Sequence, residues 1–127
     1  MFDQLEIRVL TPGRRSAAQV EWWVNGENLV AQVIGPGGYG PHAAAVFPRA
    51  GSGPLRATGE PRRVDLGEPE CTGGCCGFLS AVVQRLGDVV RWSDWEVPAG
   101  GTRPPEFDFE AARYEAALRR AETADGT

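Results

Sequence analysis

The chain has 127 residues, with 13 basic residues against 17 acidic ones and a formal net charge of −4. This length suits a single domain that buries roughly two-thirds of its unfolded surface. The acidic balance argues against a nucleic-acid binder, and no stretch approaches the roughly 20 apolar residues of a membrane span. Residues 1–25 also lack the charged start and apolar run of an export signal, so we expect a soluble, cytoplasmic protein with reduced thiols.

Three strands are predicted in the first part of the chain. Residues 5–9 alternate apolar and charged side chains, which is the period-two pattern of a half-buried strand. The apolar runs 20–24 and 29–34 flank Asn25-Gly26, a pair whose tolerance of positive φ favours a tight turn. We therefore predict a hairpin of two strands around that turn.

A long loop is predicted over residues 35–61, which hold seven Gly and five Pro. Neither helical nor strand periodicity persists there, apart from the apolar run 43–47. The loop contains His42, the only histidine of the chain. Histidine is the side-chain type that titrates near neutral pH, so His42 is the one candidate imidazole for a general base or a metal ligand. A solvated loop histidine is the alternative interpretation.

Three more strands are predicted over residues 63–66, 78–86 and 89–97, with Gly87-Asp88 as the turn between the last two. The alternation in the middle strand is imperfect, which is typical of antiparallel sheets. These strands and the N-terminal ones are expected to share one sheet.

The C-terminal segment changes period. Its apolar residues recur at spacings of three and four, which predicts one amphipathic helix over about residues 109–122. Asp108 is the candidate N-cap, and residues 123–127 are expected to form a frayed tail. Residues 1–127 are thus predicted to be a single α+β domain, in which an antiparallel sheet of about five or six strands packs against the C-terminal helix.

All three cysteines of the chain, Cys71, Cys75 and Cys76, fall within one short glycine-rich turn. A zinc site needs four ligands in a tetrahedron, and only His42 could complete a set of three thiolates and one imidazole. The adjacency of two cysteines and the departure from Cys-x-x-Cys spacing leave this signal only moderately specific. One bound zinc ion is therefore a hypothesis, and not a consequence of the spacing.

The same cysteines allow two other interpretations. Cys71 and Cys75 could form a disulfide that Cys76 resolves, although no evident basic neighbour would lower a thiol pKa. Alternatively, the three small side chains simply fill a tight turn. The acidic residues Asp65, Glu68 and Glu70 approach the turn and could assist a metal or serve as paired catalytic carboxylates, or they are solvated charges beside a turn.

The segment Trp92-Ser93-Asp94-Trp95 supplies candidate binding residues. Strict alternation along a strand would send Trp92 and Asp94 to one face and Trp95 to the other. One interpretation places one indole of the pair in the core and packs its neighbour under the helix or a loop. The other leaves an exposed indole beside Asp94 as an anchor for a partner, so Trp92, Asp94 and Trp95 are the predicted contact residues.

Three segments carry a resemblance to a known family. They are residues 68–77, which contain Cys-Thr-Gly-Gly-Cys-Cys-Gly, residues 89–95, which contain Trp-Ser-Asp-Trp, and residues 107–115, which open the C-terminal helix. In these segments the chain resembles a family of small uncharacterised actinobacterial proteins, over roughly residues 60–122. The resemblance implies a recurrent architecture and carries over no catalytic residue.

Two functional hypotheses follow. The first is a small non-enzymatic binding module that contacts an unknown protein or small ligand through the sheet face, Trp92, Trp95 and the 35–61 loop. The second is a zinc or thiol-redox protein centred on Cys71, Cys75 and Cys76. A hydrolase or transferase that uses His42 is a third possibility, for which no Gly-x-Ser-x-Gly elbow or other catalytic set is present in the sequence.

Overall fold

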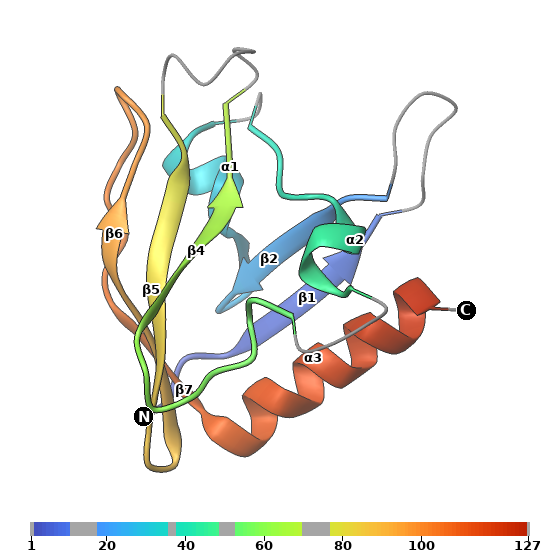
Figure 1. The fold of residues 1–127 in the computed structure, drawn as a ribbon. Helices are drawn as coiled ribbons and strands as arrows, with labels where there is room; N and C mark the ends of the chain where they lie inside the picture. The colour runs from blue at the N-terminus through green and yellow to red at the C-terminus, as the bar shows by residue number, and fades with distance from the viewer. Residues whose placement is uncertain (1, 11–17, 36–37, 49–52, 70–76, 127) are drawn as a thin grey trace.

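A computed structural model describes residues 2–10, 18–35, 38–48, 53–69 and 77–126, with side chains through Thr123. These residues fold into two antiparallel sheets with a long C-terminal helix (Figure 1). The predicted combination of antiparallel strands and one C-terminal helix is confirmed. The prediction of a single sheet of five or six strands is wrong, because the strands divide into a three-stranded and a four-stranded sheet.

The first sheet contains β1 (Leu5–Val9), β2 (Val20–Val24) and β3 (Glu27–Asn28) in that order. Strands β2 and β3 form the expected hairpin. Its turn residues Asn25 and Gly26 have φ angles of 54° and 82°, the left-handed conformation that this pair favours. The turn prediction is therefore confirmed.

The second arm of that hairpin is not the predicted strand 29–34. Residues Leu29–Val33 form the helix α1, which begins where the Asn28 side-chain oxygen accepts a hydrogen bond from the Ala31 N–H at 3.2 Å. Leu29, Val30 and Val33 are buried, at spacings that suit one face of a helix. The N-cap and this spacing outweigh the β-branched composition of the run.

The second sheet contains β4 (Arg62–Gly67), β5 (Leu79–Leu86), β6 (Val89–Glu96) and β7 (Phe107–Glu110), again in chain order. The three predicted strands in this region are confirmed to within about one residue at each end. Strand β7 is absent from the prediction, which starts the C-terminal helix at about residue 109 and places Asp108 at its N-cap.

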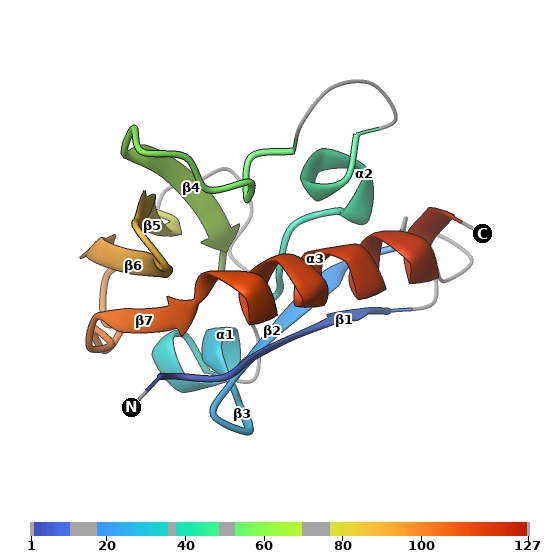
Figure 2. The same ribbon diagram turned by 90° about the horizontal axis from the view of Figure 1, so that it is seen from below.

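The C-terminal helix α3 covers Ala111–Gly126, so it begins later and ends later than predicted. Asp108 is not its N-cap, because this residue lies in β7 and its carboxylate accepts a hydrogen bond from Arg91 Nε at 2.8 Å. Helix α3 packs along β1, as Figure 2 shows. The short helix α2 (Ala43–Val46) interrupts the predicted 35–61 loop.

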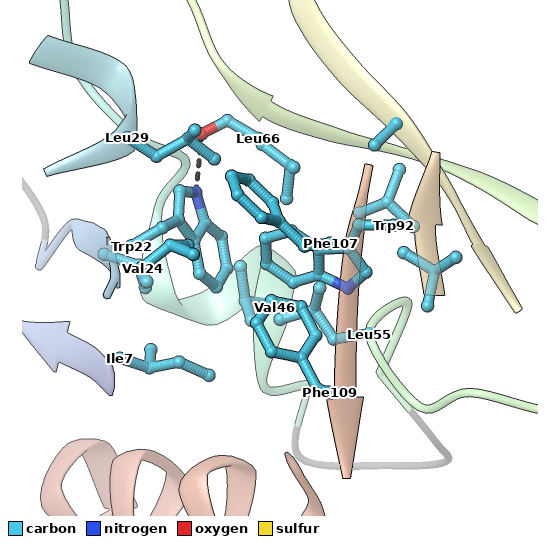
Figure 3. Close-up of a cluster of buried hydrophobic side chains, with 14 of the residues drawn as sticks. Ile7, Trp22, Val24, Leu29, Val46, Leu55, Leu66, Trp92, Phe107 and Phe109 are labelled. Carbon is cyan, nitrogen blue, oxygen red and sulfur yellow. Dashed lines mark hydrogen bonds between the residues drawn. The ribbon is translucent and has the colours of Figure 1, made fainter. Parts of the chain in front are cut away.

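The two sheets enclose a common core that is rich in aromatic side chains. The rings of Trp22 and Trp92, one from each sheet, meet edge to face with centroids 5.9 Å apart. The indole N–H of Trp22 donates a hydrogen bond of 2.7 Å to the carbonyl oxygen of Leu66 in β4 (Figure 3). A buried side chain of the first sheet thus satisfies a main-chain acceptor of the second.

Candidate functional site

The two tryptophans proposed as contact residues are buried. Trp92 is 0% exposed and Trp95 is 3% exposed, so the interpretation with covered indoles is confirmed and the one with an exposed indole is wrong. The reason is a β-bulge in β6, where Ser93 pairs with Val82 while Glu96 pairs with Ser80. The extra residue on β6 shifts the alternation, so that Trp92 and Trp95 both reach the core.

Asp94, the third predicted contact residue, is exposed and lies in this bulge with a φ of 52°. Its carboxylate accepts a hydrogen bond of 2.9 Å from Arg63 Nη2. The Arg63 guanidinium also donates to the Ser80 hydroxyl at 3.0 Å and lies 3.7 Å from the Glu96 carboxylate. Asp94 therefore belongs to an ion-paired cluster on the outer face of the second sheet.

One indole does face outward, and it is not among the predicted contact residues. Trp23 is half-buried on the outer face of the first sheet, and the Arg8 guanidinium lies 3.9 Å from the centre of its ring. The indole N–H of Trp23 donates to the Glu21 carboxylate at 3.2 Å. The Arg8 guanidinium thus covers one face of the Trp23 ring, and the Glu21 carboxylate accepts the hydrogen bond of its indole N–H.

The predicted metal ligands separate into two groups. Cys71, Cys75 and Cys76 lie outside the described residues. His42 is described, stands at the N-cap position of α2 and is exposed. Among the residues that the structure describes, no three His, Cys, Asp or Glu side chains lie close enough together to hold a metal ion.

His42 lines a hollow of about 450 Å³ between β4 and α2, which we call the β4–α2 hollow. One wall carries Pro41, His42, Ala45, Val46 and Pro54, and the opposite wall carries Arg63, Val64, Asp65, Glu68 and Phe78. Figure 1 shows α2 and β4, the two elements that contribute residues to these walls. Residues from the predicted loop and from the second sheet are thereby brought together.

The walls of the hollow are apolar, and a few polar groups stand among them. Phe78 is 44% exposed, although large aromatic side chains are usually buried. In the described part of the chain, the carboxylates of Asp65 and Glu68 have no ion-pair partner, and the His42 imidazole accepts or donates no hydrogen bond. This combination of apolar walls and a few unengaged polar groups is typical of ligand pockets.

Main-chain hydrogen bonds fix the wall that carries His42. The Tyr39 N–H donates to the Glu68 carbonyl at 3.0 Å, and the Glu68 N–H donates to the Tyr39 carbonyl at 2.9 Å. Two residues further along, the Pro41 carbonyl accepts from the Val20 N–H at 2.9 Å. The segment therefore runs from Glu68, directly after β4, to Val20 of β2, and it holds the main chain of His42 beside the first sheet.

A glycine permits this crossing. A Cβ atom on Gly40 would lie 1.9 Å from the Val20 carbonyl oxygen, so the two backbones can approach only without a side chain. The glycines of the 35–61 loop were interpreted as a sign of irregular structure. Position 40 requires glycine because the two backbones are in close contact there, and the composition of the loop does not reveal this contact.

A second hollow, of about 320 Å³, lies between α3 and the residues that follow α2. Its wall includes Tyr114, whose hydroxyl donates to the Leu55 carbonyl at 2.6 Å and accepts from Trp92 Nε1 at 3.4 Å. Burial raises the pKa of Tyr114 well above its ordinary value. Because this hydroxyl already has a donor and an acceptor, it contributes to stability and offers no free group to a ligand.

No protein-family model, curated protein or solved structure matches this chain. In the described part of the chain, none of the helices combines the length and the apolar character needed to cross a membrane. The functional conclusion therefore depends on the geometry of the β4–α2 hollow.

Proposed function

We propose that this chain is a small non-enzymatic binding module and that the β4–α2 hollow is its recognition site. The observation that carries the proposal is the presence of Phe78, His42 and two carboxylates without ion-pair partners, in the described residues, around one apolar depression. Apolar walls supply binding free energy, and a few fixed polar groups supply orientation. The volume of about 450 Å³ lies within the ordinary range for ligand pockets.

The proposed recognition surface differs from the predicted one, which was centred on the tryptophans of β6. Trp92 and Trp95 are core residues, whereas the hollow keeps part of the 35–61 loop as a binding element. In the part of the chain that is described, His42 has no hydrogen bond to a carboxylate or hydroxyl that would orient it as a general base. That arrangement favours binding over general base catalysis.

The test fills the hollow without disturbing the core. Ala44 and Ala45 are neighbours in α2 and both are exposed, but only Ala45 lines the hollow. We expect small-molecule fragments and short peptides to shift the amide NMR signals of residues 40–46 and 62–68. Ala45→Trp should abolish these shifts, and Ala44→Trp should leave them intact. Equal responses from the two variants, or no response from the wild-type protein, would contradict the proposal.

A zinc site is the second candidate function, with His42, Cys71, Cys75 and Cys76 as the ligand set. The observation in its favour is that Glu68 and Phe78 line the same hollow as His42. These two residues stand three positions before Cys71 and two positions after Cys76 in the chain. Thiolate and imidazole donors in that combination suit a tetrahedral zinc ion, whereas a redox role for the thiols would need no metal.

Elemental analysis and thiol titration of one sample separate these possibilities. If zinc is bound, we expect about one zinc ion per chain, with thiols that react only after chelation or denaturation. His42→Ala should weaken zinc retention, and Gln19→Ala, which alters the residue opposite His42 in the β-bridge, should not. Three thiols that react in the native protein without chelator would rule out the zinc site.

A further inference from the structure

We infer that the outer edge of β4 accepts a short extended peptide as an added strand, with a basic side chain of the peptide facing Asp65. This inference rests on the proposed function, since it names the ligand of the same β4–α2 hollow. It specifies both the backbone geometry and the charge of the partner.

Strand β4 is the terminal strand of its sheet, because the order is β4-β5-β6-β7. Within the described residues, its outer edge has a strand-like partner only at Glu68, which pairs with Tyr39. The Leu66 carbonyl is occupied by the Trp22 indole. Residues 62–65 therefore present an outer edge without a paired strand, and such an edge is a template for strand addition.

The hollow adjoins this edge and not one face of the sheet. Arg63, Val64 and Asp65 are consecutive residues of β4, and all three line the hollow. Consecutive side chains of a strand point to opposite faces, so the three can share one cavity only if it meets the strand from the side. A ligand in the hollow is therefore positioned to reach the main chain of β4.

The opposite wall indicates what kind of strand can enter. His42, Ala45 and Pro54 stand across the hollow from β4 and limit the space beside it. An added strand lies about 4.8 Å from its neighbour, and a single strand needs no further room on its other side. A second copy of this chain would bring its own sheet with it, and the α2 wall stands where that sheet would continue. We therefore commit to a single peptide segment.

Charge defines the side chains of this peptide. The Arg63 guanidinium is occupied by Asp94 and Glu96, whereas the Asp65 carboxylate has no ion-pair partner among the described residues. A lysine or arginine directly opposite Asp65 would form a cross-strand pair of opposite charge. The flanking peptide residues point to the other face, toward Val64 and Val46, and should be apolar.

The first experiment selects binders from a displayed library of short random peptides on the wild-type protein. We expect enrichment of sequences in which one basic residue lies between apolar residues. Asp65→Lys should weaken a selected peptide about tenfold. Asp88→Lys makes the same charge change at an exposed turn residue outside the hollow, and it should leave the affinity unchanged. No enrichment, or equal effects of the two variants, would overturn the inference.

The second experiment tests the main-chain contact directly. The selected peptide is synthesised in two series, each methylated on alternate backbone nitrogens. Because alternate N–H groups of a strand point in opposite directions, one series should abolish binding and the other should preserve it. If both series bind equally and Ala45→Trp still blocks binding, the added strand is excluded and the proposed function stands. If the peptide instead binds regardless of Ala45→Trp, the proposed function fails as well.

Sedimentation of the wild-type protein tests whether a second copy of this chain, and not a peptide, pairs with the edge of β4. We expect a monomer with and without the selected peptide. A dimer that the peptide dissociates would show that the edge of β4 pairs with a second copy, and it would overturn the inference.

Discussion

Trp92 and Trp95 pack against each other on the same side of β6, with ring centroids 6.4 Å apart, although three positions separate them in the chain. In a regular strand, residues at an odd spacing point to opposite faces. The bulge at Asp94 removes this restriction. The indole N–H of Trp95 also donates to the Pro105 carbonyl at 2.9 Å, so the second indole enters the core without losing its hydrogen bond.

The backbone at Asp94 provides the first prediction. With a φ of 52°, this residue occupies the left-handed region, which aspartate and asparagine tolerate and β-branched residues do not. We expect Asp94→Val to lower the free energy of unfolding by about 1 to 2 kcal/mol. Asp94→Asn keeps the conformation and removes only the charge that faces Arg63, so it should cost much less. Urea denaturation of the two variants compares these effects, and equal losses would contradict the role of the bulge.

Fluorescence quenching tests the placement of the four tryptophans. Trp22, Trp92 and Trp95 are at most 3% exposed, whereas Trp23 is half-buried on an outer face. Iodide in solution should therefore quench one tryptophan population and leave the larger part of the emission unchanged. Trp23→Phe should remove the quenchable fraction. Quenching that persists in this variant would show that an indole of β2 or β6 is exposed after all.

Tyr114 predicts how stability depends on alkaline pH. Burial raises the pKa of its hydroxyl in the folded state, whereas an unfolded tyrosine ionises near a pH of about 10. The stabilising contribution is therefore complete below about pH 10 and is lost as the pH rises further. The chain contains no lysine, which leaves few other groups to titrate in this range. Urea denaturation should show a steeper loss for the wild-type protein than for Tyr114→Phe.

The same variant has a second expected effect at neutral pH. Tyr114→Phe removes the donor to the Leu55 carbonyl and the acceptor for the Trp92 indole. Leaving buried polar groups without partners costs about 1 to 3 kcal/mol, so the urea midpoint should fall. An unchanged midpoint would indicate that the two groups find other partners.

Two glycine substitutions test the crossing between the sheets. Gly40→Ala would place a Cβ atom 1.9 Å from the Val20 carbonyl oxygen, so the segment that carries His42 must move away from β2. We expect a loss of about 3 kcal/mol or more in the free energy of unfolding. Gly59→Ala is the matched control, since no atom lies within 4 Å of its Cβ position, and it should change stability by less than about 0.5 kcal/mol. Thermal unfolding of both proteins provides the comparison.

The parts of the fold that the sequence predicted correctly are those determined by local rules. The alternation in residues 5–9 and the Asn25-Gly26 turn required only neighbouring side chains, and both appear as expected. Strand β7 was not predicted, and its second half fell within the predicted helix, because four residues carry too little periodicity. Phe107 and Phe109 are buried on a period of two before the helical spacing begins at Ala111.

The candidate site was harder to predict, because it is assembled from residues distant in sequence. His42 was identified from its chemistry alone, and the structure then places it opposite Asp65 and Phe78 across one hollow. No local pattern indicates that Phe78 remains exposed or that β4 is the terminal strand. The tryptophans were misplaced for a similar reason, since a single bulge at Asp94 reverses the face of every residue beyond it.

The hydrogen bond from Trp22 to the Leu66 carbonyl has a consequence for how the molecule opens. The two residues are 44 positions apart and belong to different sheets, so neither sheet can separate from the other while this indole N–H remains protected. Exchange of that proton with solvent therefore reports the dissociation of the two sheets, and it should occur only in the rarest and most extensive openings of the native state. A single indole NMR signal thus provides an internal measure of global stability.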